Sequence, residues 1–296
     1  MKEQKLPLPV KNGVSPNGLW LPTGHWNTVF DFFLEQFPHL NPAECSKRFQ
    51  RKEVVTADGQ VLTQSSQYVP GQHLYFYREL ENELAIPFEE KIIYEDENIL
   101  VADKPHFLPV APTGQYLHET LLVRLRKKLQ IDSLELCHRL DRETAGVVLL
   151  TKKQAVRAEY HALFSNRKIT KIYHAVAPTV DLNFPIKRTS RLVKSKPFFR
   201  MKEIDGPANS ETHINLLENR GINSLYQLSP ITGKKHQLRV HLAGLNIPIV
   251  DDSFYPVLLE KKPGDYASPL QLLAKSIQFI DPRSRELYYF ESKFSL

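Results

Sequence analysis

A carboxylate between two arginines is the first feature of the sequence that could do chemistry. Asp141 lies in a polar loop, residues 137–146, with Arg139 and Arg142 on either side, and an apolar run follows at 147–150. A side chain at the mouth of a rigid strand is held in place, which is common for catalytic residues. Such a carboxylate can act as a nucleophile or a general base. The same spacing also fits a structural turn capped by an aspartate, so the loop alone leaves both interpretations open.

A second polar cluster, residues 231–241, could bind an anion. Thr232 begins a pattern that fits a helix at 234–245, with Lys234 and Gln237 in its first turns. The N-terminus of a helix attracts negative charge. The cluster therefore predicts contact with an anionic ligand.

The other side chains of this cluster narrow its chemistry. His236 and His241 are five residues apart and do not share a helix face, so we expect no metal site. Arg239 lies among apolar neighbours, and a buried arginine needs a carboxylate partner. Asp141 is the predicted partner.

A third cluster lies on a predicted strand at 170–177. Alternation places Lys171, Tyr173 and Ala175 on one face. Tyr173 can be a core aromatic with a satisfied hydroxyl or a platform on which a base stacks, and the pattern slightly favours the core.

Hydrophobic periodicity predicts the elements that would hold these clusters. We expect a hairpin at 91–104, strands at 146–151, 170–177, 213–217, 224–228, 272–280 and 286–291, and helices at 119–130, 154–165 and 234–245. Strands outnumber helices and short turns join several of them. This pattern favours an α+β fold with a mixed, mostly antiparallel sheet and flanking helices.

The N-terminal third predicts a separate small module. Residues 1–25 contain four prolines and three glycines, which is typical of an extended arm. Residues 26–85 form a small α/β unit, with helices at 28–37 and 42–50, strands around an Asp-Gly turn at 53–62, and a strand at 68–77. An acidic linker then leads to the large domain, 86–296.

The charge distribution indicates a polyanionic partner. The 296 residues carry a formal net charge of +6, and residues 151–202 contain 13 Lys or Arg against two acidic residues. Such a concentration is expected of a protein that contacts phosphates, although a solvated surface is the alternative. Within it, residues 187–196 have few apolar anchors, and we expect a mobile loop that orders on a nucleic acid.

Composition excludes several other classes of protein. Apolar residues make up 42% of the chain, and its longest apolar runs are about half a dozen residues, whereas a membrane span needs about 20. The N-terminus shows no signal-peptide pattern. Two cysteines, Cys45 and Cys137, fit a reducing compartment. We therefore expect a cytoplasmic protein without a membrane partner.

Taken in order, the clusters resemble the RluA-type pseudouridine synthases, from about residue 92 to 290. The motifs that carry the resemblance are YEDENILVADKP at 94–105, HRLD at 138–141, KIY at 171–173, TGKKHQLRVH at 232–241 and PIVDD at 248–252. Five motifs in one order are specific, although each alone is weak. Residues 26–77 resemble, less specifically, an S4-type RNA-binding module.

The resemblance implies roles for individual residues. Asp141 would be the catalytic carboxylate, Tyr173 would stack on the target base, and Arg239 would pair with Asp141. Arg139 would fill the gap left by a flipped nucleotide, and Leu238 would pack beside the target base. The other candidate substrate-binding residues are Lys104, His138, Leu140, Thr232, Lys234, His236 and Gln237.

The implied reaction converts uridine to pseudouridine at a specific site in structured RNA. The base must leave C1′ through N1, turn, and rejoin through C5. The carboxylate could attack C1′ or act as a base on the ribose, and the sequence leaves both routes open. No metal or other cofactor is implied. We expect ribosomal RNA as the partner first and tRNA second, and a monomer without an obligate protein partner.

A catalytically silent RNA-binding protein or RNA chaperone is the main alternative. It would share the basic segment, but binding alone does not require Asp141, Tyr173 and Arg239 together.

Two other enzyme classes fit poorly. The HRLD motif is similar to a kinase catalytic loop, but that loop needs an asparagine where Gly146 stands. A hydrolase that uses Cys137 and His138 is disfavoured because adjacent residues on a strand point to opposite faces.

Overall fold

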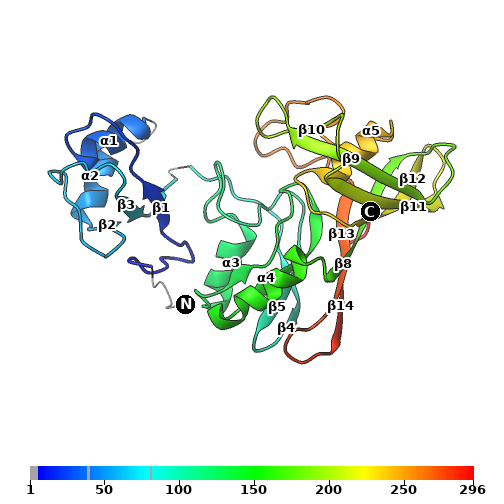
Figure 1. Cartoon of the computed structure of the whole chain (residues 1–296), viewed down its shortest axis with the longest axis horizontal. Helices are drawn as coiled ribbons and strands as arrows, with labels where there is room; N and C mark the ends of the chain where they lie inside the picture. Colours follow the sequence, from blue (N-terminus) through cyan, green and yellow to red (C-terminus); the bar gives the residue numbers. More distant parts are fainter. Residues whose placement is uncertain (1–5, 39–40, 81) are drawn as a thin grey trace. The chain divides into compact units, whose positions relative to one another are not determined.

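The fold was analysed in a computed structural model that describes residues 6–38, 41–80 and 82–296. The described residues form two compact units: those within Met1–Glu83 together with Leu125–Asp132, and Leu84–Arg124 together with Ser133–Leu296. The division falls within helix α3 (Leu121–Leu129). Figure 1 shows the elements of both units.

The smaller unit combines two helices with a three-stranded antiparallel sheet. Its elements are β1 (Asn17–Trp20), α1 (Val29–Gln36), α2 (Pro42–Gln50), β2 (Val54–Thr56) and β3 (His73–Phe76), with strand order β1-β3-β2. The two predicted helices are confirmed. The predicted strand after the Asp-Gly turn is reduced to a single bridge between Val55 and Val61.

The N-terminal segment is part of this unit. Strand β1 lies inside the predicted arm, 1–25, and pairs with β3 along its whole length. Residues 1–5 of the arm lie outside the described residues. Helix α1 begins where it does because Thr28 and Asp31 form a capping box, with both backbone-to-side-chain distances 3.0 Å.

The larger unit is built on one sheet of eleven strands. Its strands are β4 (Lys91–Glu95), β5 (Ile99–Lys104), β6 (Glu135–Leu136), β7 (Ala145–Thr151), β8 (Ile169–Pro178), β9 (Ile186–Lys194), β10 (Met201–Ile204), β11 (Ser210–Asn219), β12 (Asn223–Pro230), β13 (Leu272–Ile280) and β14 (Leu287–Glu291). The main path runs β10-β9-β11-β12-β8-β13-β7-β5-β4. A 3-10 turn (Gln154–Val156), α4 (Arg157–Ser165) and α5 (Gln237–Gly244) accompany it.

The predicted fold class is confirmed by this sheet. Among the described strands only β7 and β13 pair in parallel, and every other pair is antiparallel. Gly146 makes that contact possible: its φ is +114°, and a Cβ there would lie 2.2 Å from the Ala274 carbonyl oxygen. The contact between β7 and β13 lies at the start of β7, directly after the loop that carries Asp141.

The prediction of a mobile loop at 187–196 is wrong for most of its length. Residues 187–194 belong to β9, which pairs with β10 and β11. Polar contacts replace the apolar anchors that the sequence lacks. Arg188 pairs with Glu203, and the Ser190 hydroxyl lies 3.0 Å from the ring of His241.

A buried histidine links this strand to α5. His241 is fully buried, with Nε2 3.0 Å from the hydroxyls of Ser190 and Ser210 and Nδ1 3.0 Å from that of Thr212. Burial lowers its pKa to about 4. The ring is therefore neutral at pH 7, and its hydrogen bonds link α5 to β9 and β11.

This histidine predicts acid sensitivity. The pKa of His241 is about 4 in the folded chain against an ordinary 6.5, so the unfolded chain binds the proton more readily. Its contribution to stability is complete above pH 6.5 and is lost as the pH falls towards 4, a change of about 3 kcal/mol. Urea unfolding at pH 7.5, 6, 5 and 4.5 should show this loss. His241→Gln, which does not titrate, should give a flatter dependence on pH, and parallel profiles for the two proteins would contradict the assignment.

Candidate active site

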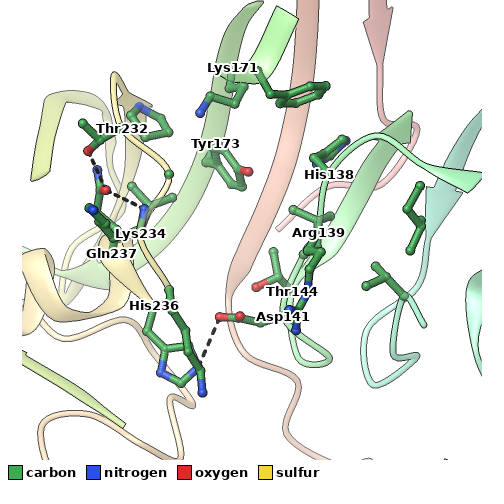
Figure 2. A pocket seen from close by; sticks show the side chains of 18 of the residues that line it. His138, Arg139, Asp141, Thr144, Lys171, Tyr173, Thr232, Lys234, His236 and Gln237 are labelled. Atoms are coloured by element: carbon green, nitrogen blue, oxygen red, sulfur yellow. Dashed lines mark hydrogen bonds and ion pairs between the residues drawn. The ribbon is translucent and has the colours of Figure 1, made fainter. Parts of the chain in front are cut away.

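The three predicted clusters meet at one open groove in the larger unit. Its volume is about 1430 Å³, and its walls come from residues 135–144, the outward side chains of β8, and residues 230–239 (Figure 2). Typical small-molecule pockets are about 300–1,000 Å³. The groove is therefore large enough for one nucleotide together with part of a polymer.

Asp141 faces two side chains of the 231–241 cluster across this groove. Its side chain is 29% exposed, and its Oδ2 lies 3.4 Å from Nη1 of Arg239 and 3.8 Å from Nε2 of His236. The predicted pairing of Asp141 with Arg239 is present, but 3.4 Å is long for a hydrogen bond. The carboxylate thus combines a neighbouring cation with access from solvent.

The closer partner of Arg239 is Asp252, which the sequence analysis missed. Arg239 Nε donates to one Asp252 oxygen at 2.8 Å and Nη2 to the other at 2.6 Å. Asp252 also accepts hydrogen bonds from the backbone N–H groups of Phe254 and Tyr255. Burial opposes the charge of Arg239, but these contacts raise its pKa, so the guanidinium stays charged and Nη1 remains for Asp141. The acidic pair in PIVDD was the available signal.

His236 has an unusual backbone that aims its ring at Asp141. Its φ is +53°, in the left-handed region, so α5 begins at Gln237 and not at the predicted 234. Thr232 and Lys234, predicted to begin the helix, therefore lie in the loop before it. Nδ1 of His236 lies 2.9 Å from the Tyr255 hydroxyl. Burial, opposed by the Asp141 carboxylate, lowers the pKa of His236 to about 4, so the ring is neutral at pH 7.

Gln237 and Thr232 hold the loop that carries His236. The Gln237 carbonyl oxygen accepts from the Thr232 hydroxyl at 2.7 Å and from the Lys234 N–H at 3.1 Å. Its amide donates to the Glu211 carbonyl and to the Thr212 hydroxyl, both at 2.9 Å. These contacts occupy the polar atoms of Gln237 and give it a positioning role, while its contact with substrate stays a prediction.

Tyr173 lies on β8 and points into the groove (Figure 2). Lys171 on the same face also lines the groove, whereas Ala175 lies in the core beneath. Burial and the Asp141 carboxylate both raise the pKa of Tyr173. Its ring is therefore a neutral, partly packed surface beside Asp141, suited to stacking.

Lys104, a predicted substrate-binding residue, instead supports the loop that carries Asp141. Lys104 is fully buried, and its Nζ donates to the carbonyls of Pro105, Leu108 and Arg142 at 2.8–3.1 Å. It is not among the groove residues, so its predicted contact with substrate is replaced by a structural role.

His138 holds the same loop although it lines the groove. Its ring stacks on Phe164 at 4.7 Å, and its Nε2 accepts from the Leu149 N–H at 3.1 Å. Burial lowers its pKa to about 3, so the ring stays neutral.

The remaining predicted residues line the groove. Leu140 and Leu238 are buried in its wall, while Arg139 and Lys234 are exposed at its edge. Further cations in the lining are Arg142, Arg167, Lys171 and Lys235. This cationic rim suits the phosphates of a nucleic acid.

The structure also bears on the Cys137 hydrolase considered from the sequence. Burial raises the pKa of Cys137 to about 12, so its thiol is not an activated nucleophile. In the parts of the chain that the structure describes, no three His, Cys, Asp or Glu side chains are grouped to hold a metal ion. No helix in those parts is long and apolar enough to cross a bilayer.

Comparison with known proteins points to one family. The family model described as RNA pseudouridylate synthase matches residues 98–244. Ribosomal large subunit pseudouridine synthase C of Buchnera aphidicola is 34% identical over 70% of this chain and 68% of its own. The mitochondrial tRNA pseudouridine(32) synthase of Saccharomyces cerevisiae is 33% identical over 56% of this chain. The match covers 37% of the yeast protein.

A solved structure has the same fold. The human RNA pseudouridylate synthase domain containing 4 superposes with a TM-score of 0.56 at 28% identity, covering 69% of this chain and 88% of its own.

Proposed function

Because this chain belongs to the RluA-type family of RNA pseudouridine synthases, we propose that its groove isomerises uridine to pseudouridine in structured RNA, with Asp141 as the catalytic carboxylate. One observation carries the assignment. A partly exposed Asp141 faces a buried, charged Arg239 that Asp252 holds in place. The ring of Tyr173 points into the same groove (Figure 2).

The reaction requires the glycosidic bond to break and a carbon–carbon bond to form. In one route Asp141 attacks C1′ and the electrons of the N1–C1′ bond pass to the uracil. The uracil turns, and its C5 attacks C1′ and displaces Asp141. The C5 proton is then lost to solvent and N1 takes up a proton from solvent, which gives pseudouridine. In the other route Asp141 first removes a proton from the ribose. In both, Arg239 orients the carboxylate and Tyr173 holds the uracil while it turns.

The target nucleotide must leave its helix before it can react. Flipping a base costs a few kcal/mol, and new contacts must offset this cost. Arg139 is exposed at the groove edge next to Asp141 and can enter the vacated stack. The cations of the rim would hold the neighbouring phosphates.

We propose ribosomal RNA as the first substrate class and tRNA as the second. The printed names of two relatives refer to the large ribosomal subunit and to tRNA. RNA binding by the smaller unit, its likeness to an S4 module, a monomeric state and a cytoplasmic location stay predictions.

The test uses RNA from cells that lack this protein. Purified ribosomal RNA and tRNA fractions are incubated separately with the protein, digested to nucleosides and separated by chromatography. We expect new pseudouridine in the ribosomal RNA. New pseudouridine in the tRNA alone would reassign the substrate, and RNA binding without pseudouridine in either fraction would favour the silent RNA-binding protein.

A further inference from the structure

A row of aromatic rings leads from the groove to an exposed hairpin tip. Phe254 lines the groove, and its ring lies 4.8 Å from the guanidinium of Arg239. Phe199 contacts Phe254 with ring centroids 5.2 Å apart, and Phe198 contacts Phe199 at 5.6 Å. Phe198 itself is 84% exposed, at the turn between β9 and β10. The row thus carries an aromatic surface outward from the catalytic groove.

This turn is fastened to the segment that holds Arg239. The N–H of Met201 donates to the Tyr255 hydroxyl at 2.7 Å. The guanidinium of Arg200 lies 5.0 Å from the Tyr255 ring and donates to the Pro256 carbonyl at 2.9 Å. Asp252, the partner of Arg239, belongs to the same segment. The contacts therefore fix the turn beside the groove.

The surroundings of Phe198 are cationic. Lys194 is exposed at the end of β9, Lys196 is exposed on the turn, and Lys202 is exposed on β10. A single exposed phenylalanine is common on protein surfaces, but an aromatic ring fixed among cations is a feature of unpaired nucleic acid recognition. Interfaces with proteins are instead depleted of lysine at their centres. Charge complementarity thus favours RNA over a protein partner.

We propose that Phe198 stacks on an unpaired base of the RNA close to the target uridine, while Lys194 and Lys196 contact the adjoining phosphates. This inference rests on the proposed function and adds a contact that selects the RNA loop. The stack lies outside the groove, so it anchors the RNA without touching the reacting atoms. Substrates with an unpaired base at that place would be preferred.

The test compares Phe198→Ala, Phe198→Trp and Ile222→Ala. Ile222 is 90% exposed at the turn between β11 and β12, which makes it a matched control. The probe is large-subunit ribosomal RNA from cells that lack the protein, at one fixed salt concentration. We expect Phe198→Ala to raise Kd about tenfold, because one base loses its stack. KM should rise with kcat unchanged, and Phe198→Trp and Ile222→Ala should match the wild type.

Binding and turnover are recorded separately, so the two proposals fail in different ways. Equal Kd and KM for Phe198→Ala and Ile222→Ala would overturn the stacking role. Loss of self-association in Phe198→Ala, measured by sedimentation, would also overturn it, since the ring would then contact a second copy of the chain. A wild type that binds RNA but forms no pseudouridine would contradict the proposed function, while the Kd comparison would still decide the role of Phe198.

Discussion

Asp141→Asn is expected to lose pseudouridine formation by a factor of at least about 10³ while the fold and RNA binding stay as in the wild type. The amide keeps the size and the acceptor oxygen of the carboxylate but is neither a nucleophile nor a base at neutral pH. The fold should be unaffected, because Asp141 is partly exposed and Arg239 keeps its closer partner, Asp252.

The variant is checked in cells that lack the native protein. Pseudouridine in purified ribosomal RNA and tRNA is measured after expression of each variant, and thermal unfolding and RNA affinity are measured on the purified proteins. Asp181→Asn, in an exposed loop, is the control and should restore the wild-type level. A rate for Asp141→Asn within tenfold of the wild type would exclude Asp141 as the catalytic carboxylate.

Asp252→Asn is expected to destabilise the larger unit by about 3–5 kcal/mol, the usual cost of removing one partner of a buried ion pair. Asp252 is fully buried, and its two oxygens hold Nε and Nη2 of Arg239. With an amide in its place the guanidinium loses its charged partner. Activity should fall as well, because the position of Arg239 beside Asp141 depends on this pair.

The neighbouring aspartate supplies the control for this experiment. Asp251 is exposed and has a φ of +61°, a conformation that asparagine also tolerates, so Asp251→Asn should behave as the wild type. Urea unfolding of the two variants gives the comparison. If Asp252→Asn were as stable as Asp251→Asn, the buried pair would not support the site.

The sheet could be predicted because most of its strands carry clear hydrophobic periodicity. The strands β5 and β7 are apolar over most of their length, and both are buried throughout. Strand β9 was missed because polar residues fill positions 187–191, so the strand shows no alternation of apolar and polar residues. The strand is held by its pairing with β11 and by the contact of Ser190 with His241. The local sequence pattern of 187–196 contains neither of these contacts.

The sequence predicted which residues line the groove better than it predicted the contacts between them. Sequence reasoning placed Asp141, Tyr173 and Arg239 together, and the structure lines one groove with all three. The predicted pairing of Arg239 with Asp141 is present, but the closer partner Asp252 was missed, since either aspartate satisfies the rule that a buried arginine needs a carboxylate. Only the path of the segment after β12 decides between them.

The start of α5 shows a different limit of the sequence. A left-handed backbone at His236 is rare for a residue that is not glycine, so no propensity predicts it. Here the conformation shortens the helix and turns the imidazole towards Asp141. Local strain of this kind concentrates at functional sites.

Release of tritium from uracil C5 tests the central claim most directly, because isomerisation through C5 must remove that hydrogen. RNA labelled at C5 is prepared from cells that lack this protein and incubated with the wild type or with Asp141→Asn. The assignment predicts release by the wild type, one tritium for each pseudouridine formed, and none by the variant. Equal release by both proteins would contradict the role of Asp141, and binding of the RNA without release by the wild type would contradict the isomerase itself.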